Sequence, residues 1–300
     1  MFTGCGTALV TPFRRDLSLD EDGLRRLVRR QIDAGIDFLV PCGTTGESPT
    51  LTRAEHLRVV EITLEEAGGK TPVLAGAGGY NTVEVIALAK ELESLGVQGI
   101  LSVTPYYNKP TQEGLYQHYR AIASAISLPI IVYSVQGRTG VNVEPATLER
   151  LSKIGNIAGV KEASGNIAQI GQVIRRVPDS FTVLSGDDAI TLPLIALGGK
   201  GLISVVANEI PAETAALVHA CLNGDFAGAR VLQRKYLPLM DVNFIESNPI
   251  PVKAAMGLMG LLEPVYRLPL VPPSPQSLER IEKVLEETGL TARQGAQVAV

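Results

Sequence analysis

The sequence contains no tryptophan and only three cysteines in 300 residues. Cys5, Cys42 and Cys221 are far apart and odd in number, so they do not form the regular framework of a disulfide-stapled secreted domain. They are typical of reduced, mostly buried thiols. The chain also lacks an N-terminal signal-peptide pattern, because MFTGCGTALV has no basic start. We therefore expect a cytoplasmic protein.

Histidines are equally scarce. His56, His118 and His219 form no HExxH motif, and no CxxC pair occurs, so neither a metal site nor a metal cofactor is expected. The chain has no GxxxxGK[ST] and no GxGxxG, which leaves phosphate-binding and dinucleotide-binding loops without support.

Charge and hydropathy exclude two further classes of partner. The net charge is −4 and the isoelectric point is about 5.6, which is unsuited to electrostatic binding of nucleic acid. No apolar run reaches the roughly 18 residues of a membrane span. Hydrophobic residues nevertheless make up 45% of the chain, enough for a large buried core.

Short apolar runs alternate along the chain with stretches of helical periodicity that begin with acidic residues and end at glycine. The eight runs are GTALVTPF (6–13), FLVPCG (38–43), PVLAGAG (72–78), GILSVTPYY (99–107), PIIVYS (129–134), IAGVKEAS (157–164), FTVLSGDD (181–188) and GLISVVAN (201–208). This alternation predicts an α/β fold, a (β/α)8 TIM barrel of parallel strands. The alternative is an open doubly wound sheet, which usually starts with a glycine-rich phosphate loop that is missing here.

From about residue 209 onward the pattern is helical only. The first of these helices would close the barrel, and the others would form a C-terminal helical appendage. We therefore divide the chain into a catalytic barrel domain, 1–224, and a C-terminal helical region, 225–300.

In a TIM barrel the chemistry gathers at the C-terminal ends of the strands. The sixth run ends in Lys161, whose amine would be partly desolvated in the barrel mouth. Desolvation lowers the pKa of a lysine, and a neutral amine can attack a ketone to form a Schiff base. The alternative is a lysine that extends from the strand end into solvent.

Schiff-base formation needs a proton shuttle, and no histidine stands at a strand end. Tyr133, on the neighbouring strand, can serve as general acid and base, provided that its surroundings lower a phenol pKa near 10. Thr44 and Tyr107 could relay the proton through their hydroxyls. Thr44 and Thr45 lie near a helix start, where hydroxyl and N–H groups can hold a carboxylate. Arg138 offers a planar fork for a second carboxylate.

Six motifs occur in order along the chain: GTTGESPTL, TPYYNKPTQEGLYQHY, GRTG, GVKEASGN, SGDD and GLISVVAN. Together they resemble the dihydrodipicolinate synthase family of pyruvate-dependent class I aldolases and lyases, over essentially the whole chain. The resemblance implies condensation of pyruvate with aspartate semialdehyde, in lysine and diaminopimelate biosynthesis. It also implies a homotetramer, in which Tyr107 reaches the active site of a neighbouring subunit.

The resemblance also implies individual roles. Lys161 would form the Schiff base with pyruvate, and Tyr133 would exchange protons in a relay with Thr44 and Tyr107. The substrate-binding residues would be Thr45 and Ile203 for pyruvate, Arg138 for the carboxylate of aspartate semialdehyde, and Gly186 at the end of the seventh strand.

An effector site for lysine is a further implication of the resemblance. The matching positions are Ser48, His56, Asn81, Glu84 and Tyr106. The alternative is that His56 and Glu84 are ordinary exposed helix residues.

Two departures from the family pattern occur. Ser134 and Gln136 replace the asparagine and proline that often flank the valine after Tyr133, so the Arg138 loop has lost a rigid proline. Tyr80 stands where asparagine is common, which affects the expected effector site and leaves the catalytic residues unchanged.

Two other functions remain open at this point. A related aldolase could cleave a hydroxy-oxo acid or N-acetylneuraminate, but sugar-acid lyases of this fold generally lack an arginine at the position of Arg138. A non-catalytic barrel that binds a keto acid is the third interpretation, and loss of the lysine or the tyrosine would have favoured it.

Overall fold

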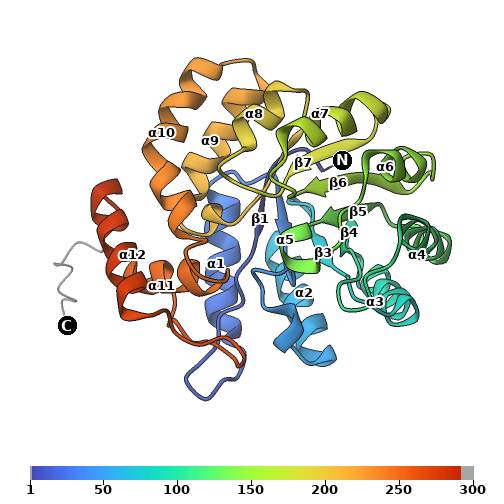
Figure 1. Ribbon diagram of the computed structural model, residues 1–300. Coiled ribbons are helices and arrows are strands. Elements are labelled where there is room, and N and C mark those ends of the chain that lie inside the picture. The colour runs from blue at the N-terminus through green and yellow to red at the C-terminus, as the bar shows by residue number, and fades with distance from the viewer. Residues whose placement is uncertain (1, 292–300) are drawn as a thin grey trace.

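The computed structural model describes residues 2–291 (Figure 1). Its single sheet has eight parallel strands in the order β2-β1-β8-β7-β6-β5-β4-β3. The strands are β1 (Gly4–Ala8), β2 (Phe38–Val40), β3 (Leu74–Gly76), β4 (Gly99–Val103), β5 (Ile130–Ser134), β6 (Ile157–Glu162), β7 (Thr182–Ser185) and β8 (Gly201–Ser204). The two ends of this order meet between β2 and β3, where Leu39 and Val73 form a parallel bridge. The sheet is therefore a nearly closed barrel.

Helices cover the outside of the barrel and extend past its last strand (Figure 1). They are α1 (Glu21–Asp33), α2 (Arg53–Ala67), α3 (Thr82–Leu95), α4 (Gln112–Ala125), α5 (Gln136–Thr139), α6 (Pro145–Leu151), α7 (Ile167–Arg176), α8 (Thr191–Ala196), α9 (Pro211–Leu222), α10 (Phe226–Val242), α11 (Ile250–Leu258) and α12 (Pro275–Thr288). Short 3-10 turns follow β2 and β8, at Ser48–Thr50 and Val206–Asn208.

Local sequence fixes where these helices start and stop. Thr52 and Glu55 form a capping box at the start of α2, and Gly68 ends that helix in the left-handed conformation. Asp20 and Asn81 cap α1 and α3 by accepting backbone N–H groups. Each cap satisfies a donor that would otherwise lack a partner, which confirms the helix boundaries expected from acidic starts and glycine stops.

The apolar residues separate into an inner and an outer core. The inner core fills the barrel below its mouth and includes Phe38, Leu74, Ile131, Leu184 and Ile203. The outer core lies between the strands and the surrounding helices. Because alternate residues of a strand face opposite sides, strands buried on both faces read as the continuous apolar runs seen in the sequence.

The C-terminal helices pack against the barrel on the side of α1 and α9 (Figure 1). Val252 and Met256 of α11 form a small apolar cluster with Val10 and Val205, which follow β1 and β8, and with Leu27 of α1. The segment 243–249, between α10 and α11, consequently reaches the barrel mouth. Residues 292–300 of the C-terminal region predicted at 225–300 lie outside the described residues.

The predicted TIM barrel with C-terminal helices is confirmed, and only the strand limits differ. The first strand covers Gly4–Ala8 rather than 6–13, and most other strands end several residues before their apolar runs do. The reason is that the ends of those runs form the βα loops of the mouth. Val10, for example, donates its N–H to the Asn208 side chain instead of to a neighbouring strand.

Three further expectations concern cysteines, membranes and metals. Cys5, Cys42 and Cys221 are free and buried, as predicted. In residues 2–291, no helix has both the length and the apolar character needed to cross a membrane. The same residues include no cluster of three or more histidine, cysteine, aspartate or glutamate side chains arranged to hold a metal ion.

Candidate active site at the barrel mouth

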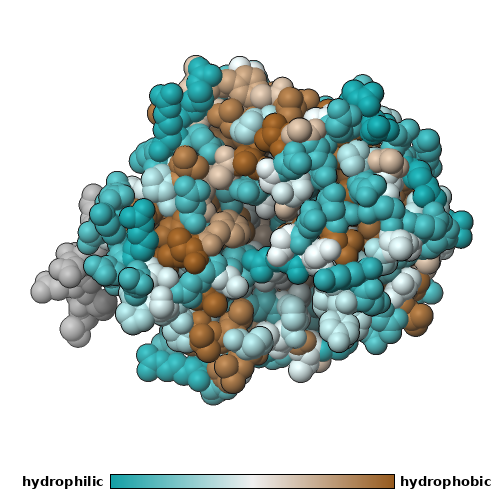
Figure 2. Space-filling model, viewed as in Figure 1, coloured by the Kyte–Doolittle hydropathy of each residue, from teal (hydrophilic) through white to brown (hydrophobic). Residues whose placement is uncertain are grey.

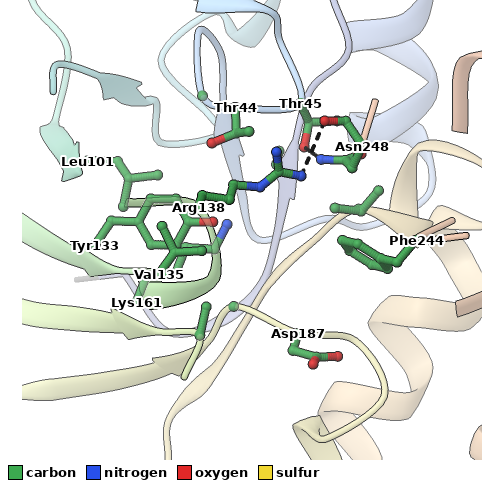
Figure 3. A pocket seen from close by; sticks show the side chains of 15 residues that line it. Thr44, Thr45, Leu101, Tyr133, Val135, Arg138, Lys161, Asp187, Phe244 and Asn248 are labelled. Atoms are coloured by element: carbon green, nitrogen blue, oxygen red, sulfur yellow. Dashed lines mark hydrogen bonds between the residues drawn. The ribbon is translucent and has the colours of Figure 1, made fainter. Parts of the chain in front are cut away.

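A cavity of about 190 Å³ opens at the C-terminal ends of the strands (Figure 3). Its polar lining includes five of the predicted site residues: Thr44, Thr45, Tyr133, Arg138 and Lys161. Gly186 also borders it, and Ala8, Leu101, Val135 and Val205 supply apolar walls. Predicted residues from four of the six motifs, GTTGESPTL, GRTG, GVKEASGN and SGDD, thus meet with Tyr133 in one pocket.

Lys161 is the penultimate residue of β6 and extends into this pocket (Figure 3). Its Cα pairs with those of Tyr133 on β5 and Leu184 on β7, and the residue is only 4% exposed. Burial above the apolar inner core lowers the pKa of the amine to about 8, with Arg138 acting in the same direction and Asp188 opposing it. The predicted desolvation of this lysine is confirmed, and the alternative of an amine extending into solvent is wrong.

Gly186 gives the lysine side chain its room. A Cβ at this position would lie 2.7 Å from the Ala163 Cβ and 3.0 Å from the Lys161 Cε. Real Cβ atoms essentially never show the first distance, and the second is tighter than nine in ten real Cβ contacts. A larger residue would therefore have to shift Ala163 and would press on the Lys161 side chain. Gly186 therefore shapes the site through the absence of a side chain.

Tyr133 lies beside Lys161, whose Nζ is 4.4 Å from the centre of the tyrosine ring. Burial raises the pKa of the phenol, although Arg138 and the nearby Thr44 side chain pull it partly back. The condition set from the sequence, a lowered phenol pKa, is therefore not met. The physical reason is that removal from water penalises the phenolate more than its neighbours stabilise it. Tyr133 is protonated at neutral pH and starts as a proton donor.

Arg138 is held by the short helix α5 and by the C-terminal segment. Its Nη2 donates to the Asn248 backbone carbonyl at 3.2 Å, and the Asn248 Nδ2 donates to the Thr45 Oγ1 at 3.0 Å (Figure 3). Thr139 stabilises the loop by donating from its Oγ1 to the Val135 and Val141 carbonyls. These contacts order the loop despite the missing proline.

Two of the predicted residues lie outside the cavity lining. Ile203 is 1% exposed and belongs to the inner core with Tyr133 and Leu184, so it supports the floor of the site. Tyr107 follows β4 and is 88% exposed. Its hydroxyl does not line the pocket of its own chain, although Thr44 and Tyr133 both do.

A second cavity, of about 320 Å³, lies next to the first. Thr44, Val135 and Arg138 line both cavities and form the wall between them. The second cavity brings together three of the five expected effector residues, Ser48, His56 and Tyr106.

The two other effector positions, Asn81 and Glu84, are exposed and do not line this cavity. Asn81 instead caps α3 through the Val83 N–H. His56 is buried, its Nε2 lies 2.9 Å from the Gly76 carbonyl oxygen, and burial lowers its pKa to about 4. His56 is therefore not an exposed helix residue, whereas Glu84 is exposed on α3.

Among the lining residues that the sequence analysis did not predict are Asp187, Phe244 and Asn248. Asp187 lies within the SGDD motif, where only Gly186 was singled out. Phe244 and Asn248 belong to the C-terminal segment FIESNPIP, which has no periodic pattern. A polar asparagine before the prolines of this segment was the one available signal.

A buried ion pair near the pocket was also missed. Glu47 ends the GTTGE turn that carries Thr44 and Thr45, and its Oε1 lies 2.6 Å from the Nζ of Lys253 in α11. Both side chains are completely inaccessible to solvent. The pair joins the turn that carries Thr44 and Thr45 to the C-terminal helices, in parallel with the Thr45–Asn248 hydrogen bond.

Comparison with known proteins agrees with this geometry. A model of the Dihydrodipicolinate synthetase family matches residues 1–288. The 4-hydroxy-tetrahydrodipicolinate synthase of Koribacter versatilis is 54% identical over 288 residues, covering 96% of this chain and 96% of that protein.

Solved structures give the same result. The dihydrodipicolinate synthase of Thermotoga maritima is 47% identical with a TM-score of 0.95, covering 97% of this chain and 99% of that one. The chloride-inhibited dihydrodipicolinate synthase of Acinetobacter baumannii, complexed with pyruvate, is 41% identical with a TM-score of 0.95, covering 97% of this chain and all of that one. This chain therefore belongs to the dihydrodipicolinate synthetase family and is an enzyme, a lyase of that family.

Proposed function

We propose that this enzyme condenses pyruvate with L-aspartate 4-semialdehyde to give 4-hydroxy-tetrahydrodipicolinate, through a Schiff base on Lys161. The observation that carries the proposal is the Lys161 amine, which is buried at the barrel mouth with its pKa lowered to about 8. A substantial fraction of the amine is then neutral near pH 7–8 and able to attack the pyruvate ketone. The product belongs to lysine and diaminopimelate biosynthesis.

The reaction proceeds in balanced steps. The Lys161 amine adds to C2 of pyruvate, and Tyr133 donates the proton with which the hydroxyl leaves as water. The resulting imine draws electrons from C3, which loses a proton and attacks the aldehyde carbon, and the aldehyde oxygen gains a proton to become the hydroxyl of the product. The amine of the second substrate then attacks C2 and displaces Lys161, which closes the ring. One water leaves for each pair of substrates.

The two carboxylates are assigned to different groups of the pocket. Thr44 and Thr45, in the turn after β2, hold the carboxylate of pyruvate beside Lys161. Arg138 holds the carboxylate of aspartate semialdehyde, because only one of its guanidinium nitrogens makes a hydrogen bond within the described residues. Gly186 leaves space for the pyruvyl group, and Ile203 supports it from below.

A coupled assay tests the choice of second substrate. Pyruvate with aspartate semialdehyde should turn over, whereas pyruvate with sugar aldehydes should react far more slowly. The reverse preference would assign the enzyme to the sugar-acid lyases, and no turnover with either would favour a binding barrel.

Arg138→Ala should raise the KM for aspartate semialdehyde by about ten- to hundredfold, since a charge-assisted contact contributes about 1.5–3 kcal/mol. The KM for pyruvate should change much less. Arg175→Ala, at an exposed arginine of α7, is the matched control. An equal rise of the KM values for both substrates would indicate instead that the loop had lost its structure.

The proposed assembly is a cytoplasmic homotetramer. Tyr80, Val83, Tyr106 and Tyr107 are exposed apolar or aromatic residues after β3 and β4 and suit a contact with a second copy. The three free cysteines suit a reducing compartment. Chains carrying Tyr107→Phe and Lys161→Ala should regain part of their activity when mixed and reassembled. No recovery after verified subunit exchange would show that Tyr107 acts within its own chain.

The second cavity is the proposed binding site of lysine as an effector. Ser48, His56 and Tyr106 supply its polar groups, and Glu84 would pair with the ligand ammonium. Because Tyr80 replaces a common asparagine, we expect weak and partial inhibition in a lysine titration of the coupled assay. Glu84→Thr should weaken it further, and Glu279→Thr on α12 should leave it unchanged. A flat response up to millimolar lysine would refute this site.

A further inference from the structure

The condensation requires an enamine of pyruvate on Lys161, and loss of a proton from C3 is only one way to form it. A 2-oxo acid that carries a carboxylate on C3 reaches the same enamine by losing carbon dioxide. We propose that the barrel-mouth site also decarboxylates such four-carbon 2-oxo diacids, of which oxaloacetate is the simplest, to pyruvate. This inference rests on the proposed function, because both reactions start from an imine at Lys161.

The dimensions and chemistry of the pocket admit such a substrate. Condensation joins three carbons of one substrate to four of the other, so the site accommodates more atoms than a four-carbon diacid has. The carboxylate on C3 projects from the carbon that forms the new bond during condensation. It therefore points to where the second substrate binds, which is the part of the pocket near Arg138 and Asn248 (Figure 3).

The pocket wall contains apolar and cationic groups, which have opposite effects on the stability of the substrate carboxylate at C3. Leu101, Val135 and Phe244 line the cavity and disfavour an ionised carboxylate, so loss of neutral carbon dioxide relieves a desolvation cost. The Asp187 carboxyl, on the same cavity, acts in the same direction whenever it is ionised. Arg138 opposes them, because its guanidinium binds the carboxylate and stabilises the reactant. Arg138 should therefore improve binding of the diacid without accelerating the loss of carbon dioxide.

The reaction balances without an oxidant or reductant. The ketone carbon of the diacid and the Lys161 amine form an imine and release water. The bond between C3 and its carboxylate carbon breaks, its electron pair forms the enamine double bond, and carbon dioxide leaves. A proton, supplied by Tyr133 or water, adds to C3, and water then hydrolyses the imine. The net change is diacid plus one proton giving pyruvate and carbon dioxide.

The test measures carbon dioxide and pyruvate formed from oxaloacetate, with a chelator present to suppress decarboxylation by free metal ions. At equal enzyme concentration, the wild type should form pyruvate at least ten times faster than Lys161→Ala. The Lys200→Ala variant, which removes an exposed lysine, should react at the wild-type rate. Borohydride added during turnover should trap the three-carbon pyruvyl group on Lys161.

A second measurement separates this inference from the proposed function. Equal rates for the wild-type and Lys161→Ala enzymes would overturn the decarboxylation if pyruvate and borohydride still label Lys161, and the proposed function would then stand. Failure of that labelling would overturn both.

The Arg138→Met variant tests the orientation of the diacid. Its KM for oxaloacetate should rise by about ten- to hundredfold, as expected on loss of a charge-assisted contact. Its kcat should be equal to or higher than that of the wild type. An unchanged KM together with a reduced kcat would contradict the assigned role of Arg138 in this reaction.

Discussion

Two lysines of this chain are buried, and their surroundings differ. Lys253 has Glu47 Oε1 at 2.6 Å and the Thr11 carbonyl oxygen at 3.1 Å, and it lies above the ring of Phe13. Lys161 has the Tyr133 ring beside it and no carboxylate in ion-pair contact among the described residues. Burial lowers the pKa of both amines, but at Lys253 the partner Glu47 counteracts it.

The difference separates a structural lysine from a reactive one. A buried ammonium with a carboxylate and a carbonyl as partners stays charged and ties two segments together. A buried amine without such partners loses its proton more readily and becomes a nucleophile. Both side chains lie near the barrel mouth, so the presence of an acidic partner, rather than burial, decides which role each lysine has.

The largest expected effect is the loss of reactivity at Lys161. Lys161→Ala should abolish both turnover and the adduct trapped by pyruvate and borohydride, because no other buried lysine in the described part of the chain lacks a partner. The protein should remain folded, since a strand-end residue contributes little to the core. Mass spectrometry and a thermal melt check the two outcomes. A pyruvyl adduct in the mutant would show that the nucleophile is elsewhere.

The next largest effect concerns Lys253. Lys253→Met should lower the free energy of unfolding by about 3–5 kcal/mol, because it leaves Glu47 buried without a partner. The double variant Glu47→Gln with Lys253→Met should recover most of this loss, since it removes both charges. Urea unfolding measures both values.

The matched control for Lys253 is Lys283→Met, at an exposed lysine 4.0 Å from Glu287. This substitution should change the free energy of unfolding by no more than about 0.5 kcal/mol. A double variant less stable than either single one would show that Lys253 and Glu47 do not act as a pair.

The smallest effect is the pH dependence of Lys161. As the pH falls below about 8, the neutral fraction of its amine should fall, approaching tenfold per unit, and the rate of pyruvate capture should fall with it. Between about 8 and the ordinary value of 10.5, the unfolded chain retains a proton that the folded chain has released. The contribution of Lys161 to the free energy of unfolding therefore rises with pH in this window.

Trapping rates between pH 6 and 9 measure the first effect, and unfolding of wild type and Lys161→Met at several pH values measures the second. A capture rate independent of pH would mean that the amine is not the titrating group. A Met variant with the same pH dependence of stability would lead to the same conclusion.

The sequence by itself determined the barrel and the composition of its mouth. Helix caps such as Thr52 with Glu55 depend on residues three or four apart, and strand burial appears as a continuous apolar run, so both are readable locally. The position of Lys161 at the end of such a run placed it at the mouth.

Only the tertiary structure decided the partners of these residues. Asn248 bonds to Thr45 across 203 positions and Lys253 pairs with Glu47 across 206, distances over which no periodic pattern extends. The tertiary structure also decided that burial raises the phenol pKa of Tyr133 and that the Tyr107 side chain is exposed. Burial and ion pairing depend on which distant segments the fold brings into contact. The neighbours of Lys161 and Lys253 therefore had to be known before the reactive lysine could be told from the structural one.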